Sequence, residues 1–306
     1  MAPQLGPTYA QYDNGASVFP FYDNFAGTSL PSGWQTQTST VTGTVNNGIT
    51  ITNTVNNGAG IAYSTSTISA PYIIEDYYSA SGTSGGNPNE LGGIGLTSYP
   101  NGSNTPYLYY GTTGFYNGSY QFNNIVNGTW QTPSGTYTTN TWYIMTFENS
   151  GAGTIYQVNY GSNFSKTSST YPSAEYILLP GSIGMTVYIK WVRARAYPPS
   201  GTAPTNTLGT INLVDDLSFI YAIVPIIQLT YTPIRITNTQ STATPAPFQQ
   251  MIQINTADFT DIVFNTSTPQ ANFEFFSSVP SQALPAWIES YSNGILTIWV
   301  SLPNGI

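Results

Sequence analysis

Cysteine and histidine are both absent from this chain of 306 residues. Their absence excludes disulfides, zinc sites with thiolate or imidazole ligands, thiol nucleophiles and every catalytic triad that needs an imidazole base. Charged residues are also scarce, at 6% of the chain against about 25% in ordinary soluble proteins. The chemistry that remains open is that of carboxylates, calcium bound through oxygen atoms, or none.

Basic residues are the rarer of the charged types, with five Lys and Arg against 13 Asp and Glu. So few cations cannot release many counterions from a phosphate backbone, and we expect no nucleic-acid partner. The net charge is −8 at pH 7. Because few carboxylates are present to titrate, we expect a stability that is nearly flat from pH 7 to about pH 2.

Long hydrophobic runs are missing as well. The longest, Leu217 to Leu229, is shorter than the roughly 20 residues that cross a bilayer, so no membrane span is expected. The first twenty residues lack the basic start and apolar core of a signal peptide. We expect an extracellular or cell-surface protein. If it is exported, this chain is a processed or internal portion of it.

Turn signals and short alternating runs fill the chain. Eight Asn-Gly pairs occur, and Asn-Gly is the strongest short signal for a β-hairpin. Runs with a period of two, such as Thr186 to Arg195, lie between these turns. The pattern predicts an all-β fold: an antiparallel jelly-roll sandwich plus a smaller β-sandwich domain. Six apolar side chains should be largely buried in the jelly roll: Phe21, Phe25, Trp34, Trp142, Ile144 and Trp191.

A stretch of prolines and small polar residues, Pro198 to Asn206, predicts a linker. We therefore divide the chain into four parts. These are an N-terminal extended segment (1–18), a jelly roll (19–198), a linker (199–209) and a small β-domain (210–306).

Two sets of motifs resemble known modules. Residues 18–34, with the Phe-Tyr-Asp-Asn-Phe run and Gly33-Trp34, resemble the opening of a laminin-G-like (concanavalin A-like) jelly roll, and 191–199 resemble its last strand. Residues 247–252, 287–290 and 299–303 resemble a small β-domain of unknown function. Archaeal modular cell-surface proteins alternate the two modules, so the resemblance implies an archaeal surface glycoprotein.

In such chains the small domain precedes the jelly roll, whereas here residues 3–15 resemble its end and 228–306 its start. An incomplete sheet exposes an edge that recruits another strand. We therefore expect a structural subunit that forms a head-to-tail homopolymer, a filament, by β-strand complementation. The alternative is that residues 3–14 fold back on their own jelly roll.

Candidate carboxylate sites are weak. No two acidic residues lie two or four positions apart, so no strand presents a pair on one face, and we expect no enzyme and no catalytic residue. The alternative is a catalytic pair assembled from separate strands, which the sequence does not single out. No cofactor is expected except calcium, for which Asp23, Glu75 and Asp76 are the candidate ligands. The alternative places these acids at solvent-exposed turns.

A candidate glycan-binding face consists of Trp191, Arg193, Arg195 and Tyr197, which alternate and so share one face of a strand. The alternative is a structural cation–π ladder with Trp191 buried. A carbohydrate-binding adhesin module is accordingly the second functional hypothesis. Five sequons are candidate N-glycosylation sites: Asn101, Asn117, Asn127, Asn163 and Asn265.

Overall fold

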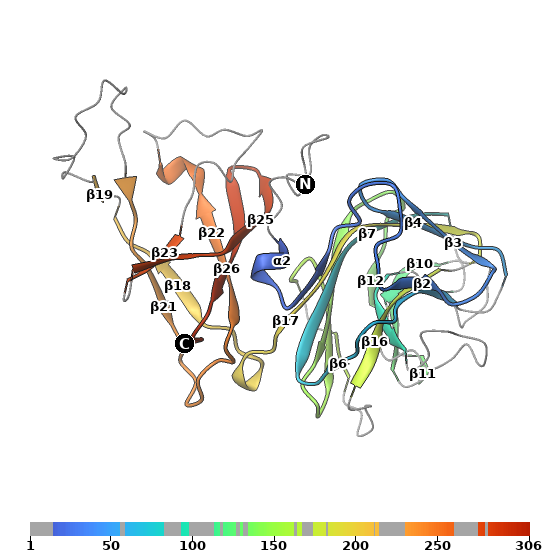
Figure 1. Cartoon of the computed structure of the whole chain (residues 1–306), viewed down its shortest axis with the longest axis horizontal. Coiled ribbons are helices and arrows are strands. Elements are labelled where there is room, and N and C mark those ends of the chain that lie inside the picture. Colours follow the sequence, from blue (N-terminus) through green and yellow to red (C-terminus); the bar gives the residue numbers. More distant parts are fainter. Residues whose placement is uncertain are drawn as a thin grey trace. The chain divides into compact units, whose positions relative to one another are not determined.

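The computed structural model describes residues 15–55, 59–82, 93–97, 113–116, 119–126, 129–130, 134–161, 164–166, 174–181, 183–210, 212–213, 230–259, 275–278 and 281–306. They form two compact units, one of Phe19–Tyr197 and one of Pro198–Ile306 with the short helix α2 (Gly15–Val18). Every ladder between their strands is antiparallel (Figure 1). The predicted all-β fold class is therefore confirmed.

The larger unit is a sandwich of two sheets. The main sheet contains, in spatial order, β15 (Phe164–Lys166), β14 (Thr154–Val158), β13 (Tyr143–Asn149), β7 (Tyr72–Gly82), β17 (Met185–Ala196), β4 (Ile49–Asn53) and β3 (Val41–Val45), and β1 (Phe21–Asp23) also pairs with β17. The second sheet contains β2 (Trp34–Thr36), β5 (Gly60–Tyr63), β16 (Ala174–Pro180) and β6 (Ile68–Ser69), with β8 (Gly95–Thr97) paired to β16. A further ladder joins β9 (Thr113–Tyr116), β10 (Ser119–Val126), β11 (Thr129–Trp130) and β12 (Ser134–Thr136). The described residues of this unit contain no helix.

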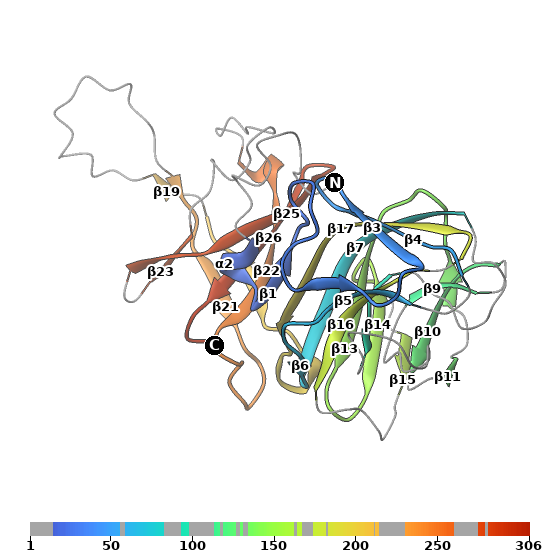
Figure 2. The same cartoon turned by 45° about the vertical axis from the view of Figure 1, so that its right-hand side comes forward.

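The two sheets enclose one apolar core. Alternate residues of β17, namely Met185, Val187 and Ile189, belong to it, together with Ile74 and Tyr78 of β7. β7 and β17 lie side by side at the centre of the main sheet, as both views show (Figures 1 and 2). These two strands carry the side chains that matter most for the site.

The burial predicted for six large side chains is only partly correct. Phe25, Trp34 and Trp191 are buried, whereas the remaining three are partly exposed: Phe21, Trp142 and Ile144. The reason in β13 is its alternation. Met145 and Phe147 enter the core, so Ile144 faces the other side of the sheet.

Two Asn-Gly pairs form the hairpin turns that the sequence predicts. Asn47 and Gly48 join β3 to β4, and Asn293 and Gly294 join β25 (Ala286–Ser292) to β26 (Ile295–Leu302). All four residues have positive φ, between 48° and 128°. Asparagine and glycine tolerate this conformation, which the three-residue turn 46–48 and the two-residue turn 293–294 both use.

The smaller unit has its own core. Its main sheet has the order β22 (Phe248–Asn255), β26 and β25, and Ile252, Ile288 and Ile298 lie in the core below it. Three two-stranded ladders accompany this sheet: β18 (Thr205–Leu208) with β21 (Ile234–Thr237), β19 (Asn212–Leu213) with β20 (Thr230–Tyr231), and β23 (Phe275–Ser278) with β24 (Ser281–Leu284). Two 3₁₀ turns complete it, η1 (Pro199–Gly201) and η2 (Thr256–Asp258).

Part of the expected linker belongs to this unit. Thr205 to Leu208 pair with β21, and Leu208 packs against the core, so 199–209 is not a free linker throughout. The prolines end at Pro204, which leaves the following residues free to form a ladder. Within the described ranges, no helix has the length and apolar character needed to cross a membrane.

Candidate functional site

The site lies on the side of the main sheet that faces away from the sandwich core, called here the outward face. In the middle of this face Glu75 of β7 lies opposite Thr146 of β13 and opposite Arg193 of β17. Arg195 follows two residues later on the same face. The pairing of β7 with β17 therefore brings one carboxylate between two guanidinium groups.

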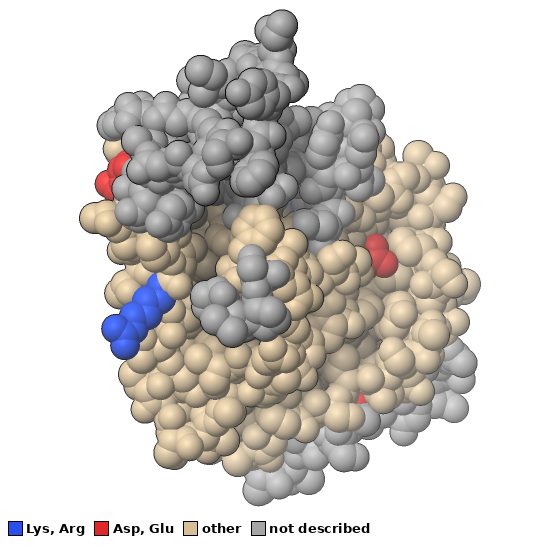
Figure 3. Space-filling model, turned by 60° about the vertical axis from the view of Figure 1, so that its left-hand side comes forward, with Lys and Arg blue, Asp and Glu red and all other residues tan. Residues whose placement is uncertain are grey.

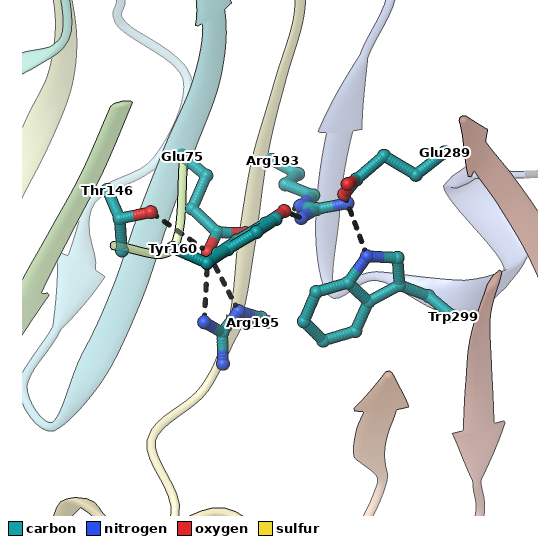
Figure 4. A network of polar contacts seen from close by, with 7 residues as sticks. All are labelled: Glu75, Thr146, Tyr160, Arg193, Arg195, Glu289 and Trp299. Carbon is teal, nitrogen blue, oxygen red and sulfur yellow. Dashed lines mark hydrogen bonds and ion pairs between the residues drawn. The ribbon is translucent and has the colours of Figure 1, made fainter. Parts of the chain in front are cut away.

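Glu75 binds both arginines directly (Figure 4). Its Oε2 accepts from Arg193 Nε at 2.6 Å, and its Oε1 accepts from Arg195 Nη2 at 2.9 Å and from the Thr146 hydroxyl at 3.3 Å. Arg193 Nη2 also donates to the Tyr160 hydroxyl at 2.6 Å. Both carboxylate oxygens are occupied, so Glu75 serves first as the counter-charge of this network.

Burial and ion pairing shift the pKa of Glu75 in opposite directions. Removal from water raises the pKa of this carboxyl, but the charges and hydrogen bonds of Arg193 and Arg195 outweigh that effect and lower the pKa to about 2. Glu75 is therefore ionised at neutral pH. A second acid, Glu148 of β13, lies opposite Ile73 on the same face. Burial raises the pKa of Glu148, the positive charge of Arg195 lowers it, and the negative charge of Glu75 raises it further.

An aromatic cluster adjoins the ion network. The Tyr77 ring lies 5.0 Å from the Trp142 ring and 5.9 Å from the Trp191 ring, centroid to centroid. Lys190 Nζ lies 5.8 Å from the centroid of Trp142. Tyr77, Trp142 and Lys190 are partly exposed, whereas Trp191 is buried. We call the three partly exposed residues the Tyr77–Trp142–Lys190 patch.

The four residues of the predicted glycan-binding face differ from one another in burial and in contacts. Arg193 is buried, with its Cζ 4.6 Å from the Trp191 ring centroid and 4.7 Å from that of Phe19. Arg195 is bound to Glu75, with 10% of its side chain exposed. Tyr197 lies beyond the end of β17 and is partly exposed. Trp191 and Arg193 thus form the cation–π contact that was the alternative interpretation.

The carboxylates proposed for calcium do not meet at one point. Glu75 and Asp76 are neighbours on β7 and point to opposite faces of the sheet. Asp23 accepts hydrogen bonds from Phe25 N at 2.8 Å and from Trp34 Nε1 at 2.8 Å. The part of the chain that the structure describes holds no group of three or more Asp or Glu residues able to bind a metal ion. The set Asp23, Glu75 and Asp76 is therefore not one ion site.

Further buried polar groups occur in the smaller unit. Trp299 Nε1 donates to Glu289 Oε2 at 2.8 Å, and both side chains are buried (Figure 4). On the face of the molecule drawn in Figure 3, the described surface shows only a few scattered charged side chains. The five sequons all lie outside the described residues, so glycosylation stays a prediction: Asn101, Asn117, Asn127, Asn163 and Asn265.

Sequence reasoning missed the three residues of the patch. Trp142 was assigned to the core, although the alternation of Met145 and Phe147 could have placed the residues of opposite parity on the outward face. Tyr77 and Lys190 are joined to Trp142 only by the pairing of β13, β7 and β17. No local sequence motif predicts the pairing of these three strands.

Comparisons with known proteins find only distant similarity. No protein-family model matches the chain. An uncharacterized protein of Sulfolobus islandicus rod-shaped virus 1 is 33% identical over 84 residues, which are 26% of this chain and 14% of that protein. The chain thus spans only a small part of that relative.

Solved structures of similar fold cover a little more than half of this chain. A carbohydrate-binding module, CBM66 from Bacillus subtilis, is 15% identical with a TM-score of 0.36, covering 52% of this chain and 94% of its own. The β-glucanase of Bacillus licheniformis is 14% identical with a TM-score of 0.37, covering 57% and 96%. SCLam, an endo-β-1,3(4)-glucanase of family GH16, is 11% identical with a TM-score of 0.42, covering 57% and 89%.

This comparison contradicts one expectation from the sequence. We expected a chain that is not an enzyme, yet glucanases of family GH16 are among the structures that it resembles. That expectation is withdrawn. The TM-scores lie below 0.5, so these structures assign no residue of the present chain to catalysis or binding, and the site rests on its own geometry.

Proposed function

We propose that this chain is an extracellular or cell-surface protein whose jelly roll binds carbohydrate on the Tyr77–Trp142–Lys190 patch. One observation carries the proposal: two aromatic rings 5.0 Å apart lie partly exposed beside an ammonium group on the outward face. The three side chains come from β7, the residue before β13, and β17.

Aromatic rings and hydroxyl-rich ligands suit one another. A ring face offers an apolar surface for the C–H side of a pyranose, and a tyrosine hydroxyl or an ammonium group can hydrogen-bond its hydroxyls. Trp191 stacks on Tyr77 from the buried side, with ring planes 20° apart. Rings held in this way lose little conformational entropy when a ligand binds, which favours affinity.

Isothermal titration calorimetry of the whole chain against a panel of neutral and acidic oligosaccharides tests the proposal. We expect Trp142→Ala to weaken binding at least tenfold, or about 1.4 kcal/mol. Phe276→Ala removes an aromatic ring that is 57% exposed in the smaller unit, and should leave binding unchanged. If no oligosaccharide binds, or if Trp142→Ala binds as well as the wild type, the proposal is wrong.

A second candidate function is glycoside hydrolysis, favoured by the two carboxylates of the outward face. Glu75 and Glu148 are diagonal neighbours on paired strands, so their Cα atoms lie about 7–8 Å apart and both side chains project from the same face. Glycosidases use two acidic side chains whose carboxyl groups lie about 5 to 9.5 Å apart, a spacing that neighbours of this kind can reach. The pKa of Glu75 is lowered and that of Glu148 is raised, which suits an ionised group beside a proton donor.

Release of reducing sugar from polysaccharides distinguishes this second function from binding alone. Glu148→Gln should lower the rate by about 10²- to 10⁴-fold if Glu148 donates a proton. Asp258→Asn, which changes an exposed acid of the smaller unit, serves as the matched control. A wild-type chain that binds saccharides and releases no reducing sugar would be a binding protein only.

The filament expected from the sequence has less support than carbohydrate binding. Residues 3–14, whose backbone pairing would decide it, lie outside the described residues. The described helix α2 packs beside β25 and β26 of its own chain. The carbonyl of Ile306 accepts from Thr244 N at 2.9 Å and from Asn238 Nδ2 at 3.1 Å, also within one chain. The head-to-tail homopolymer therefore stays a prediction from the sequence, behind carbohydrate binding.

A further inference from the structure

The few cations of this chain are concentrated on one strand. The whole sequence contains five Lys and Arg residues, and three of them lie on β17: Lys190, Arg193 and Arg195. Glu75 binds both arginines, and the nearby Glu148 also interacts electrostatically with Arg195. Neighbouring acids therefore balance the arginines, and Lys190 is the cation of this strand whose charge is left beside the patch.

Lys190 is the accessible member of this group. Its ammonium donates one hydrogen bond, to the backbone oxygen of Asn47 at 3.1 Å. No carboxylate among the described residues forms an ion pair with it. An ammonium group has three N–H donors, so two remain for a ligand.

The aromatic neighbours fix where that charge lies. Lys190 Nζ is 5.8 Å from the Trp142 ring centroid, within the range of a cation–π contact. Trp142 in turn contacts Tyr77. The substituents of a sugar ring that stacks on Trp142 and Tyr77 would therefore lie close to the ammonium group of Lys190, which forms no ion pair with a described carboxylate.

We propose that the patch selects saccharides that carry an anionic group, a carboxylate or a sulfate, which pairs with Lys190 while the sugar ring stacks on Trp142 and Tyr77. The inference rests on the proposed carbohydrate binding and adds the chemical class of the ligand. A hydrogen bond between an ammonium and an anionic oxygen is about twice as strong as one between neutral groups. The anionic saccharide should therefore bind more tightly than a neutral one of the same length.

The experiment compares three probes of equal length by calorimetry on the whole chain: an oligogalacturonate, a sulfated oligosaccharide and a neutral gluco-oligosaccharide. We expect at least one anionic probe to bind about tenfold more tightly than the neutral one. Which of the two anionic probes binds identifies the anionic group.

Substitutions at Lys190 then test whether this residue causes the preference for anionic saccharides. Lys190→Gln should weaken binding of the anionic probe about tenfold more than it weakens binding of the neutral probe, whereas Lys190→Arg should keep the preference for the anionic probe. Arg235→Gln removes the same charge from an exposed position of the smaller unit and should have no effect. Circular dichroism of each variant confirms that it folds.

Two results separate the inference from the function on which it rests. If the neutral probe binds as tightly as the anionic ones, or if Lys190→Gln leaves the preference intact, the anionic selectivity is wrong and carbohydrate binding stands. If none of the three probes binds, nor any member of the wider panel, carbohydrate binding itself is wrong and the inference falls with it.

Discussion

Asp76 should make this protein less stable as the pH rises above about 4. Its carboxyl points into the sandwich core, opposite Met145 of β13 and Val192 of β17, and is fully buried. Neither oxygen has a hydrogen-bond partner on another described residue. Burial raises the pKa of Asp76 well above its usual value, opposed by a hydrogen bond from its own backbone and reinforced by the negative charge of Glu75.

The sign follows from proton linkage. A folded-state pKa raised above the unfolded value of 3.8 means that the stabilisation is complete below pH 3.8 and is lost as the pH rises toward the folded-state pKa. Over that interval the free energy of unfolding falls by about 1.4 kcal/mol per pH unit. Burial also raises the pKa values of Asp23 and Glu148, which adds to the same trend.

At lower pH, Glu75 has the opposite effect: it makes the free energy of unfolding rise as the pH rises. Lowering its pKa from 4.5 to about 2 corresponds to about 3 kcal/mol of stability, present above pH 4.5 and lost as the pH falls toward 2. The two trends together give a maximum of stability between about pH 4 and 5. This replaces the flat profile that the small number of carboxylates led us to expect.

Urea unfolding of the wild type and of Asp76→Asn between pH 4 and 7 measures the effect. The slope of stability against pH should be shallower in Asp76→Asn by about 1.4 kcal/mol per pH unit, or about 3–6 °C in Tm for a unit of this size. Asp258→Asn, at an exposed position, should keep the wild-type slope. Equal slopes in the wild type and Asp76→Asn would refute the reasoning, whatever their absolute stabilities.

Three other expectations follow from the structure and the sequence. Glu75→Gln removes the carboxylate that binds the buried Arg193 and the partly buried Arg195, and should lower the free energy of unfolding by about 3–5 kcal/mol. An unchanged urea midpoint would contradict the network. Gly60→Ala places a methyl group against the backbone of β16 and should cost about 1–3 kcal/mol, so an unchanged Tm would argue against that close approach. At least two of the five sequons, with Asn117 and Asn127 favoured, should carry glycan in native material, and an unmodified intact mass would speak against it.

The fold could be predicted because its signals are local. The turn at Asn47 and Gly48 needs only two residues that accept positive φ, and the flanking strands alternate over a few positions. Glycine and asparagine at such turns, together with period-two runs, specify antiparallel hairpins without any knowledge of distant partners. The all-β class follows from repeating this signal along the chain.

The site could not be predicted because it depends on strand pairing over long sequence distances. Glu75 and Arg193 lie 118 positions apart, and only the register of β7 against β17 makes them partners. The sequence showed that Arg193 and Arg195 share a face, but not which acid they meet. The same holds for Trp142, whose contact with Lys190 requires three strands to be placed in order.

One feature of β17 links the core to the outward face, and its signal was present in the sequence. Before residue 190 the odd-numbered residues enter the core, as Val187 and Ile189 do, whereas after it the even-numbered Val192 and Ala194 do so. The pairing with β7 shifts at this point, which is a β-bulge. Strict alternation would have sent Arg193 into the apolar interior, where an unpaired charge costs several kcal/mol. The change of parity in the apolar pattern therefore predicts the bulge, and the bulge is what lets one strand supply both the core and the cations beside the patch.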